Sequence, residues 1–410
     1  MQALATFQSL KNRRFAQLYA AQTISLFGDA LTWVGLALLA FELVGENAAA
    51  VLATALTLRV VAFVALAPLA GALADRIDRK TLLVGADLAR VGVIGLVPFV
   101  SETWQVYVLI FLLNAFTAFF TPTYKATIPL VTGADDYPKA IALSGATNAV
   151  LGVLGPGVAG GIAALLGWQS IFWVDAVTFL LSGLLILLLP VRLSVVAKRR
   201  DQGVTNAWQD VKEGTTRLWK DASIRFALVL QLVTSIAGAW VLVNTVTHVK
   251  SNLALGDTSY GWVMAAFGIG ATLAALAFGA FGKQLPRTTF VLLGTLTTSL
   301  AVLPANFLGL GPLMALWLLA GAGQTLVNVP TQTLIADRTP EHAQGRVYGA
   351  HFAWSHLWWA GAYPLAGWLG SANPENSFVY GGIIALVLLT ATTLWLSPKK
   401  SVAVIPTGER

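Results

Sequence analysis

Cysteine is absent from this chain of 410 residues, and charged residues make up only 11% of it. Without thiols the protein forms neither disulfide bonds nor thiolate metal sites. The sequence has no Gly-rich loop ending in Lys-Ser or Lys-Thr, which argues against an ATP-driven pump, and no serine–histidine–acid pattern in a context that suits a hydrolase. We therefore expect a protein that is not an enzyme and needs no cofactor, and any energy it uses should come from an ion gradient.

Apolar residues, in contrast, make up 56% of the chain, and its mean hydropathy is +0.72. They form runs of about twenty residues, which is the length at which an α-helix crosses a bilayer. The sequence predicts an all-α membrane protein with twelve transmembrane helices, at residues 15–43, 49–74, 81–101, 104–130, 139–166, 168–192, 224–249, 259–282, 288–308, 310–335, 343–370 and 377–397.

The net charge of +7 could indicate a nucleic-acid partner, but the placement of the basic residues argues against one. Lysines and arginines gather in the terminal segments and in every second loop, whereas the loops between carry Glu46, Glu102, Glu375 and a single Lys250. This asymmetry follows the positive-inside rule. We expect a multi-pass protein of the plasma membrane, the inner membrane of a bacterium, with both termini cytoplasmic. It should act as a monomer in the lipid bilayer, without nucleic acid.

One long polar segment, residues 194–223, separates the sixth and seventh apolar runs. Shifting the chain by 208 residues places residues 71–79 on residues 279–287 and Pro156 on Pro364, which suggests internal duplication. We predict two pseudo-symmetric six-helix halves, 1–193 and 224–400, a linker at 194–223 and a cytoplasmic tail at 401–410. Apolar side chains at helical spacing predict an amphipathic helix in the linker: Trp208, Val211, Thr215, Leu218 and Trp219.

A cluster of charged residues with the spacing Gly71-x-x-x-Asp75-Arg76-x-x-Arg79 lies between the second and third apolar runs. It resembles the loop signature of the major facilitator superfamily, and the resemblance covers essentially the whole chain. It implies the major facilitator fold and a conformational latch at Gly71, Asp75, Arg76 and Arg79; charges that merely hold helix ends at the surface are the alternative. Further segments resemble the branch of macrolide-efflux proteins and the enterobactin exporter: Ser25-Leu-Phe-Gly28-Asp29, Asp87-Leu-Ala-Arg90, Phe119-Phe-Thr-Pro122 and Gly155-Pro156.

Polar side chains recur at helical spacing within the first, fourth, seventh and tenth apolar runs. In the family that the chain resembles, these four helices line the central cavity, so the resemblance implies a solute path along them. Each stripe taken alone would also fit ordinary hydrogen bonding between helices. The candidate cavity residues are Gln22, Ser25, Asn114, Thr117, Gln231, Gln324 and Asn328.

Asp29 and Arg59 lie near the middle of the first and second apolar runs, on helices expected to be antiparallel neighbours. Because an unpaired charge at that depth is costly, we predict that the two meet as an ion pair. Protonation would break the pair, which makes Asp29 a candidate proton-coupling carboxylate and Arg59 its candidate partner. A permanent structural salt bridge is the alternative. Asp175 and the pair Asp87/Arg90 are secondary candidates, because their helices are peripheral in the architecture that the resemblance implies.

Two of the four histidines, His351 and His356, fall among three tryptophans in the eleventh apolar run. Neutral histidine binds nickel, cobalt or zinc, and it also relays protons near neutral pH. A five-residue spacing separates the two rings by about 140° around a helix, so a shared metal ion would need a third ligand such as Asp29 or Asn148. The segment resembles the eleventh helix of nickel-resistance exporters. Hydrogen bonding within an aromatic helix interface is the alternative.

Taken with the resemblance, these residues imply secondary active, proton-coupled export of a small toxic, drug-like compound from the cytoplasm by alternating access. Two alternatives for the cargo stay open. One is a divalent transition metal, nickel or cobalt, bound by His351 and His356, and the other is a lipid or a siderophore. A non-transporting helical scaffold is a further alternative of a different class, which the absence of any solvent-connected cavity would favour.

Overall fold

The structure, a computed structural model, describes residues 7–74, 77–133, 136–190, 204–282 and 284–397. Within these residues every regular element is a helix. The α-helices are α2 (Arg13–Val44), α3 (Ala48–Ala74), α4 (Arg79–Leu96), α5 (Thr103–Thr132), α6 (Tyr137–Leu166), α7 (Gln169–Leu187), α8 (Val204–Lys220), α9 (Ala222–Thr247), α10 (Asp257–Phe281), α11 (Arg287–Val302), α12 (Leu310–Arg338), α13 (Glu341–Ala372) and α14 (Ser377–Leu396). Short turns join several of them: η1 (Phe7–Lys11), η2 (Gly45–Asn47), η3 (Val97–Phe99), η4 (His248–Asn252), η5 (Ala305–Phe307) and η6 (Pro374–Asn376).

Each predicted apolar run coincides with one helix, α2–α7 for the first six and α9–α14 for the last six. Among the described residues, nine stretches are long and apolar enough to cross a membrane, and the first of them runs from α2 into α3. The all-α membrane fold class is therefore confirmed, while twelve separate crossings stay a prediction. Helix ends differ from the predicted bounds by a few residues. The sixth run, for example, was expected at 168–192 and forms Gln169–Leu187.

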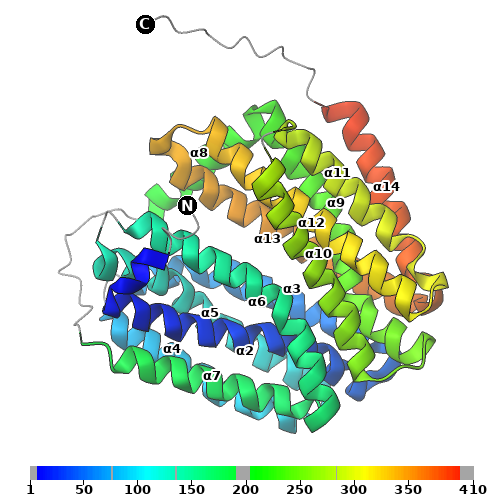
Figure 1. The fold of residues 1–410 in the computed structure, drawn as a ribbon, viewed down its shortest axis with the longest axis horizontal. Coiled ribbons are helices and arrows are strands. Elements are labelled where there is room, and N and C mark those ends of the chain that lie inside the picture. The colour runs from blue at the N-terminus through cyan, green and yellow to red at the C-terminus, as the bar shows by residue number, and fades with distance from the viewer. Residues whose placement is uncertain (1–6, 75–76, 134–135, 191–203, 283, 398–410) are drawn as a thin grey trace, which may run out of the picture.

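The helices gather in two groups that lie side by side in Figure 1, α2–α7 in blue to green and α9–α14 in green to red. In the first group α2 packs against α6 and α7, and α3 packs against α5. In the second group α12 packs against α10 and α11, and α13 packs against α9. Two helix pairs make most of the contact between the groups: α6 with α10, and α3 with α13.

Local sequence explains where several helices begin and end. The side chain of Asn12 caps the first turn of α2, and Asp78 does the same for α4 by accepting from the backbone N–H of Thr81. Helices α5 and α6 end at Gly133 and Gly167, whose φ angles of 78° and 83° lie in the region that favours glycine. Capping side chains and glycines between the apolar runs thus determine where these helices begin and end.

The two groups meet most closely at one end of the bundle, through glycine. On α6 a Cβ atom at Gly160 would lie 2.4 Å from the Cα of Gly261 on α10, so the two backbones are in direct contact. On α13 a Cβ at Gly367 would lie 2.3 Å from the Cβ of Ala53 on α3. Small residues at such crossings let transmembrane helices approach closely enough for dispersion forces to hold them.

An ion pair reinforces the same end of the bundle. Lys250 Nζ lies 2.6 Å from Asp257 Oδ1 within the second group and 3.4 Å from Glu42 Oε1 at the end of α2. We call this end, marked by Gly160, Gly367 and Lys250, the closed end. The opposite end, at which α2 and α13 begin, is the open end.

Helix α8 lies within the predicted linker and packs against the open end of α13 (Figure 1). Arg346 Nη1 of α13 lies 2.8 Å from Glu213 Oε2 of α8, and the indole rings of Trp219 and Trp354 meet edge to face, 5.4 Å apart. A Cβ at Gly214 would lie 2.3 Å from the carbonyl oxygen of Arg346. The amphipathic helix is therefore docked on the second group by charge, aromatic contact and close backbone approach.

Gly160→Ala should destabilise the protein, because the new methyl group meets the Gly261 backbone and the two helices must separate. We expect a loss of about 1–3 kcal/mol, seen as a lower melting temperature in detergent. Gly161→Ala is the matched control, since a Cβ there meets nothing within 4 Å. Equal melting temperatures for the two variants would contradict the close crossing.

Asp221, just outside the membrane-spanning helices, caps α9 and lies 3.1 Å from Arg338 Nη1. Burial alone would raise its pKa, but the Ile224 N–H and the Arg338 guanidinium outweigh it and hold the pKa below its ordinary value of 3.8. A depressed pKa adds stability above the unfolded-state value, and the gain is lost as pH falls through the folded-state value. Asp221→Ala should lower stability by about 1 kcal/mol at neutral pH, and this difference should shrink below about pH 4. Thermal unfolding in detergent at a series of pH values measures it; a pH-independent difference would contradict the assignment.

Candidate functional site

A cavity of about 680 Å³ lies between the two helix groups. Its walls come from α3 and α5 of the first group and from α9, α12 and α13 of the second. This volume is within the range of roughly 300–1,000 Å³ that small-molecule sites in proteins occupy. Most of its lining residues belong to the parts of these helices that lie towards the open end. The cavity is therefore large enough for a drug-sized compound and is approached from that end.

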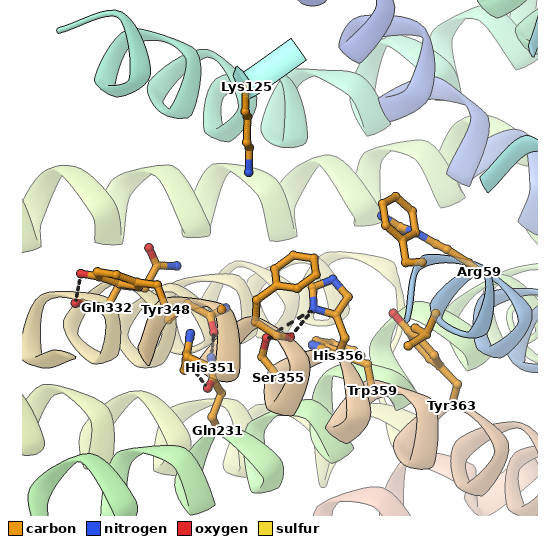
Figure 2. A pocket seen from close by; sticks show the side chains of 15 residues that line it. Arg59, Lys125, Gln231, Gln332, Tyr348, His351, Ser355, His356, Trp359 and Tyr363 are labelled. Atoms are coloured by element: carbon orange, nitrogen blue, oxygen red, sulfur yellow. Dashed lines mark hydrogen bonds between the residues drawn. The ribbon is translucent and has the colours of Figure 1, made fainter. Parts of the chain in front are cut away.

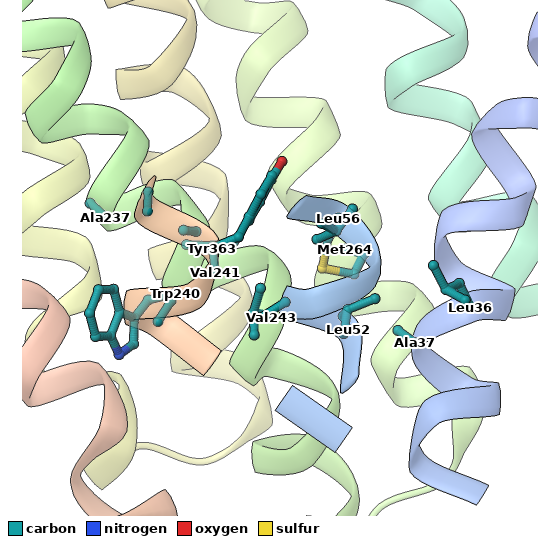
Figure 3. Close-up of a cluster of buried hydrophobic side chains, with 14 of the residues drawn as sticks. Leu36, Ala37, Leu52, Leu56, Ala237, Trp240, Val241, Val243, Met264 and Tyr363 are labelled. Carbon is teal, nitrogen blue, oxygen red and sulfur yellow. The ribbon is translucent and has the colours of Figure 1, made fainter. Parts of the chain in front are cut away.

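Figure 2 shows the two facing walls of this cavity. Lys125 points inward from α5, across from His351, Ser355 and His356 on α13, while Arg59 and Tyr363 form the deep wall. Beyond them an apolar cluster closes the space between the groups. Figure 3 shows this cluster, in which Leu52 and Leu56 of α3 lie near Val243 of α9 and Met264 of α10. The cavity therefore narrows into an apolar region before the closed end, and this region contains a smaller apolar pocket.

A chain of hydrogen bonds orders the wall from the second group. His351 Nε2 donates to Gln231 Oε1 at 3.0 Å, and Gln231 Nε2 donates to Asn328 Oδ1 at 2.9 Å. The chain joins α13, α9 and α12, and it fixes the ring orientation of His351, which is only 6% exposed. Gln231 and Asn328 were predicted cavity residues, and both line the cavity.

His356 is engaged differently from His351. Its Nδ1 donates to the carbonyl oxygen of Phe352 at 2.8 Å, and its ring packs against the Phe352 ring with centroids 3.9 Å apart. In the part of the chain that the structure describes, no three histidine, aspartate or glutamate side chains gather closely enough to hold a metal ion. The predicted metal role of His351 and His356 therefore stays a prediction, and the described residues supply no third ligand.

Arg59 and Lys125 are the cationic residues of the cavity lining, and no aspartate or glutamate is among its described lining residues. The Arg59 guanidinium lies over the ring of Trp33, 4.2 Å from its centroid. The described residues contain no ion pair between Arg59 and Asp29, the pairing that we expected. Asp29 lies instead beside Arg90, with 3.9 Å between Asp29 Oδ2 and Arg90 Nη1.

Arg90 is the centre of a buried charge cluster, which we define as Arg90, Asp29, Asp87 and Asp175. These residues come from α2, α4 and α7 of the first group. Arg90 pairs with Asp87 three residues before it, and both side chains are almost fully buried. Asp29 is the most exposed member, at 26%. Within the apolar part of the bundle, the Arg90 guanidinium therefore contacts two carboxyl groups, those of Asp29 and Asp87, and the third, that of Asp175, belongs to the same cluster.

Hydroxyl groups and aromatic rings complete the cluster. Thr32 donates to Asp175 Oδ2 at 2.5 Å, and Ser182 donates to Asp87 Oδ2 at 2.8 Å. The Arg90 guanidinium lies between two phenyl rings, with its Cζ 4.3 Å from the ring centroids of both Phe120 and Phe179. The carboxyl of Asp175 has hydroxyl partners and no cation in contact, which is an arrangement that a neutral carboxylic acid also satisfies.

The cluster depends on a residue that the sequence had already singled out. A Cβ at Gly28 would lie 2.1 Å from both Asp175 Oδ1 and Thr178 Oγ1, so only glycine lets α7 come this close to α2. Asp87, Arg90 and Asp175 ranked as secondary candidates because of their peripheral helices. The adjacent Gly28-Asp29 pair was the sequence signal that could have made these three residues primary candidates. A glycine beside an acid within a membrane helix leaves room for polar groups of a neighbouring helix.

The other predicted cavity residues do not line this cavity. Ser25 is buried and faces the charge cluster, accepting from Arg90 Nη1 at 3.4 Å. Asn114 and Thr117 donate to carbonyl groups of their own helix, those of Ile110 and Leu113. Gln22 and Gln324 each carry a buried Oε1 without a hydrogen-bond partner.

The predicted latch is described only in part, because Asp75 and Arg76 lie outside the described residues. Gly71 belongs to the last turns of α3. Arg79 is buried at the start of α4, and its Nη1 donates to the carbonyl oxygen of Ala126 on α5 at 2.6 Å. Arg79 thus joins two helices of the first group at the open end.

Sequence reasoning missed one face of α13 and one residue of α5. Tyr348, Ser355, Trp359 and Tyr363 line the cavity at three- to four-residue steps that also include Phe352. This helical spacing is a signal by which the sequence alone could have identified the face. Lys125 on α5 falls near the end of an apolar run, a position that by sequence alone is typical of a charge at the membrane surface.

Comparison with known proteins gives a consistent result. The family model described as Major Facilitator Superfamily matches residues 18–246 and 228–410. The chain is similar to the uncharacterized MFS-type transporter YfiS of Bacillus subtilis (strain 168), with 30% identity over 375 residues that cover 86% of this chain and 87% of that protein. It is 27% identical over 222 residues to macrolide efflux protein A of Streptococcus pyogenes, covering 53% of this chain and 54% of that protein.

Two further likenesses cover more of the chain than the macrolide efflux protein does. The multidrug efflux pump Tap of Mycolicibacterium fortuitum is 27% identical over 303 residues, which cover 68% of this chain and 71% of that protein. The crystal structure of the nucleoside transporter NupG matches with a TM-score of 0.74 at 13% identity, covering 94% of this chain and all of that chain. At that identity the structural likeness shows the fold alone.

Arg90→Gln should be the most destabilising single change in the cluster, because it leaves the buried Asp87 and the partly exposed Asp29 without a contacting cation. We expect a loss of about 3–5 kcal/mol of stability in detergent. Asp175→Asn should cost about 1 kcal/mol or less, since the amide oxygen can still accept from Thr32 and the Thr178 hydroxyl keeps the backbone carbonyl oxygen of residue 175 as its acceptor. Arg13→Gln, an exposed change at the start of α2, is the control for loss of a positive charge. If Arg90→Gln and Asp175→Asn melt at the same temperature, Arg90 does not organise the cluster.

Proposed function

The chain belongs to the major facilitator superfamily, and we propose that it is a secondary active exporter of a small amphipathic, drug-like compound from the cytoplasm. The observation that carries this proposal is the cavity of about 680 Å³ between the helix groups, approached from one end and sealed at the other. Such a cavity is what alternating access requires, because a solute must reach its site from one side of the membrane at a time.

We assign the open end to the cytoplasm. The support is the distribution of basic residues, which gather in the loops and terminal segments of that end according to the positive-inside rule. With this orientation the conformation is inward-open, and the seal at Leu52, Leu56 and Met264 faces the outside. A compound in the cytoplasm or inner leaflet then reaches the cavity directly.

We propose that transport rocks the halves, residues 1–193 and 224–400, against each other. The glycine crossings of α6 with α10 and of α3 with α13 concentrate the contact between the groups at the closed end. Outward opening must break the Lys250–Glu42 ion pair, which joins the two groups and is half exposed at Glu42. An exposed pair of this kind contributes little, about 1 kcal/mol or less, so it does not lock the protein in one state.

Two relatives support a drug-like cargo. They are the macrolide efflux protein A and the multidrug efflux pump Tap. The cavity of this chain carries aromatic and neutral polar side chains together, among them Phe352, Trp359, Tyr348 and Gln332. Such a lining suits compounds that have both an apolar body and hydrogen-bonding groups.

We propose proton coupling through Asp29, with Arg90 as its contacting partner in this conformation. Three carboxyl groups beside one guanidinium cannot all be ionised at low cost in an apolar environment, so the cluster is suited to gaining and losing a proton. Asp29 is the partly exposed member, which gives it access to solvent that Asp87 and Asp175 lack. Arg59 attracts Asp29 without contact, which leaves a change of partner between states open.

The metal alternative receives less support from the geometry. His351 is bonded to Gln231, His356 is bonded to the Phe352 carbonyl, and the cavity lining adds the cations Arg59 and Lys125. A divalent cation entering the cavity would meet like charge before it met a ligand. Drug-like cargo is therefore our first choice.

In proteoliposomes with an imposed pH gradient, wild-type protein should move a lipophilic drug against its concentration gradient. Asp29→Asn should abolish this uphill movement, because an amide cannot release a proton, while movement down the drug gradient continues. Glu46→Gln, which removes an exposed acidic group in η2, should behave as wild type. The measurement is drug fluorescence or radiolabel uptake with and without a protonophore.

Full uphill transport by Asp29→Asn would show that Asp29 is not the proton-coupling residue.

Growth of an efflux-deficient bacterium that expresses the protein tests which cargo is exported. Expression should raise tolerance of lipophilic drugs and leave nickel and cobalt tolerance unchanged. Metal tolerance that disappears in the double variant His351→Ala/His356→Ala would instead favour the metal alternative.

A further inference from the structure

The cavity continues into a second, apolar space towards the closed end. This pocket has a volume of about 200 Å³ and is lined by Trp33, Leu56, Met264 and Phe267, among other apolar side chains. It shares two residues with the cavity, Arg59 and Tyr363. Because a cavity of about 150 Å³ is enough for benzene, the pocket has room for a small aromatic body. A positive charge thus lies at the boundary between a polar and an apolar compartment.

The Arg59 guanidinium at this boundary lacks an acceptor. One contact is to the ring of Trp33, and the described residues give it no hydrogen bond and no ion pair. Tyr363 and His356 lie near it, and both are neutral groups in their ordinary state. Asp29 attracts it from a distance but contacts Arg90 instead. A guanidinium at this depth is costly without an anionic partner, so a ligand that brought one would be strongly favoured.

Lys125 adds a second positive charge on the facing wall (Figure 2). Its side chain is exposed in the cavity and makes no ion pair with any described residue. No carboxylate among the described lining residues offsets Arg59 and Lys125. The field inside the cavity therefore attracts anions and repels cations.

We infer that the cargo of this exporter is an amphipathic organic anion, a carboxylate or sulfonate attached to an aromatic body. The acid group binds Arg59, whose planar guanidinium matches a carboxylate with two parallel hydrogen bonds. The aromatic body occupies the pocket between Trp33, Met264 and Phe267. Lys125 attracts the anion at the open end, and the His351–Gln231–Asn328 chain supplies neutral hydrogen-bonding groups beside it. This inference rests on the proposed export function and specifies the chemical class of its substrate.

Binding of three matched probes to the purified protein in detergent tests the inference. The probes are 2-naphthoate, 2-naphthamide and 2-naphthylmethylammonium, which share one aromatic body and carry a negative, zero or positive charge. Quenching of tryptophan fluorescence reports binding, since Trp33 lies in the pocket and Trp359 in the cavity. Naphthoate should bind about tenfold or more tightly than the amide, and the ammonium probe most weakly.

Variants identify the residue responsible. Arg59→Gln should lower naphthoate affinity about tenfold or more and leave naphthamide affinity unchanged, whereas Arg59→Lys should retain part of the preference for the anion. Lys125→Gln should give a smaller loss that fades at high salt, because Lys125 acts on the anion at longer range. Arg13→Gln, exposed and outside the cavity, should bind all three probes as wild type does. Unchanged melting temperatures show that the Arg59 variants are folded.

The binding assay does not depend on transport, which separates this inference from the proposed function. Equal affinity for the three probes, tighter binding of the ammonium probe, or naphthoate affinity unaffected by Arg59→Gln overturns the inference, whether or not the protein exports anything. Preference for naphthoate that depends on Arg59 supports it. If that preference appears but proteoliposomes never move naphthoate, the export proposal fails and the anion site remains.

Discussion

Arg90 holds the most demanding interaction among the described residues, because its buried guanidinium contacts carboxylates of two helices, Asp29 on α2 and Asp87 on α4, in a cluster that also contains Asp175 of α7. A charge in the apolar part of a membrane protein persists only beside a counterion or hydrogen-bond donors. Asp87 and Ser182 fix α4 against α7, Thr32 and Asp175 fix α7 against α2, and Arg90 reaches Asp29. The cluster therefore joins α2, α4 and α7 of the first group, and Asp29 is its partly exposed member. If Asp29 gains and loses a proton as we propose, the change of charge occurs among contacts that join these three helices.

Most of the fold followed from the sequence, and much less of the site did. Apolar runs predicted each long helix because membrane helices need about twenty apolar residues, a constraint that acts locally. Contacts between side chains of different helices, in contrast, depend on residues far apart in the sequence. Asp29 and Arg59 have similar depths but different partners, since the rotation of each helix decides whether two side chains meet. Gln231 and Asn328 were found because both face the cavity, whereas Ser25 on an equally polar stripe faces the charge cluster.

The two helix groups contribute different chemistry to the cavity. Its cations, Arg59 and Lys125, come from α3 and α5 of the first group, while the second group supplies neutral donors and acceptors from α9, α12 and α13. A cargo that touches both walls joins the halves by charge on one side and by hydrogen bonds on the other. Internal duplication would have begun with equal halves, and this difference between them is where specificity for one kind of solute can arise.

In the export cycle that we propose, a positive residue at the deep wall of the cavity also affects the energetics of transport. Suppose that each cycle exports one monovalent anion bound at Arg59 and returns one proton through Asp29. Both movements transfer one positive charge equivalent into the cell, so each cycle transfers two. The membrane potential of a bacterium is negative inside, and it contributes about 2.3 kcal/mol per charge for each 100 mV. Voltage then drives export together with the pH gradient, so the exporter would keep working at an external pH at which the proton gradient alone has vanished.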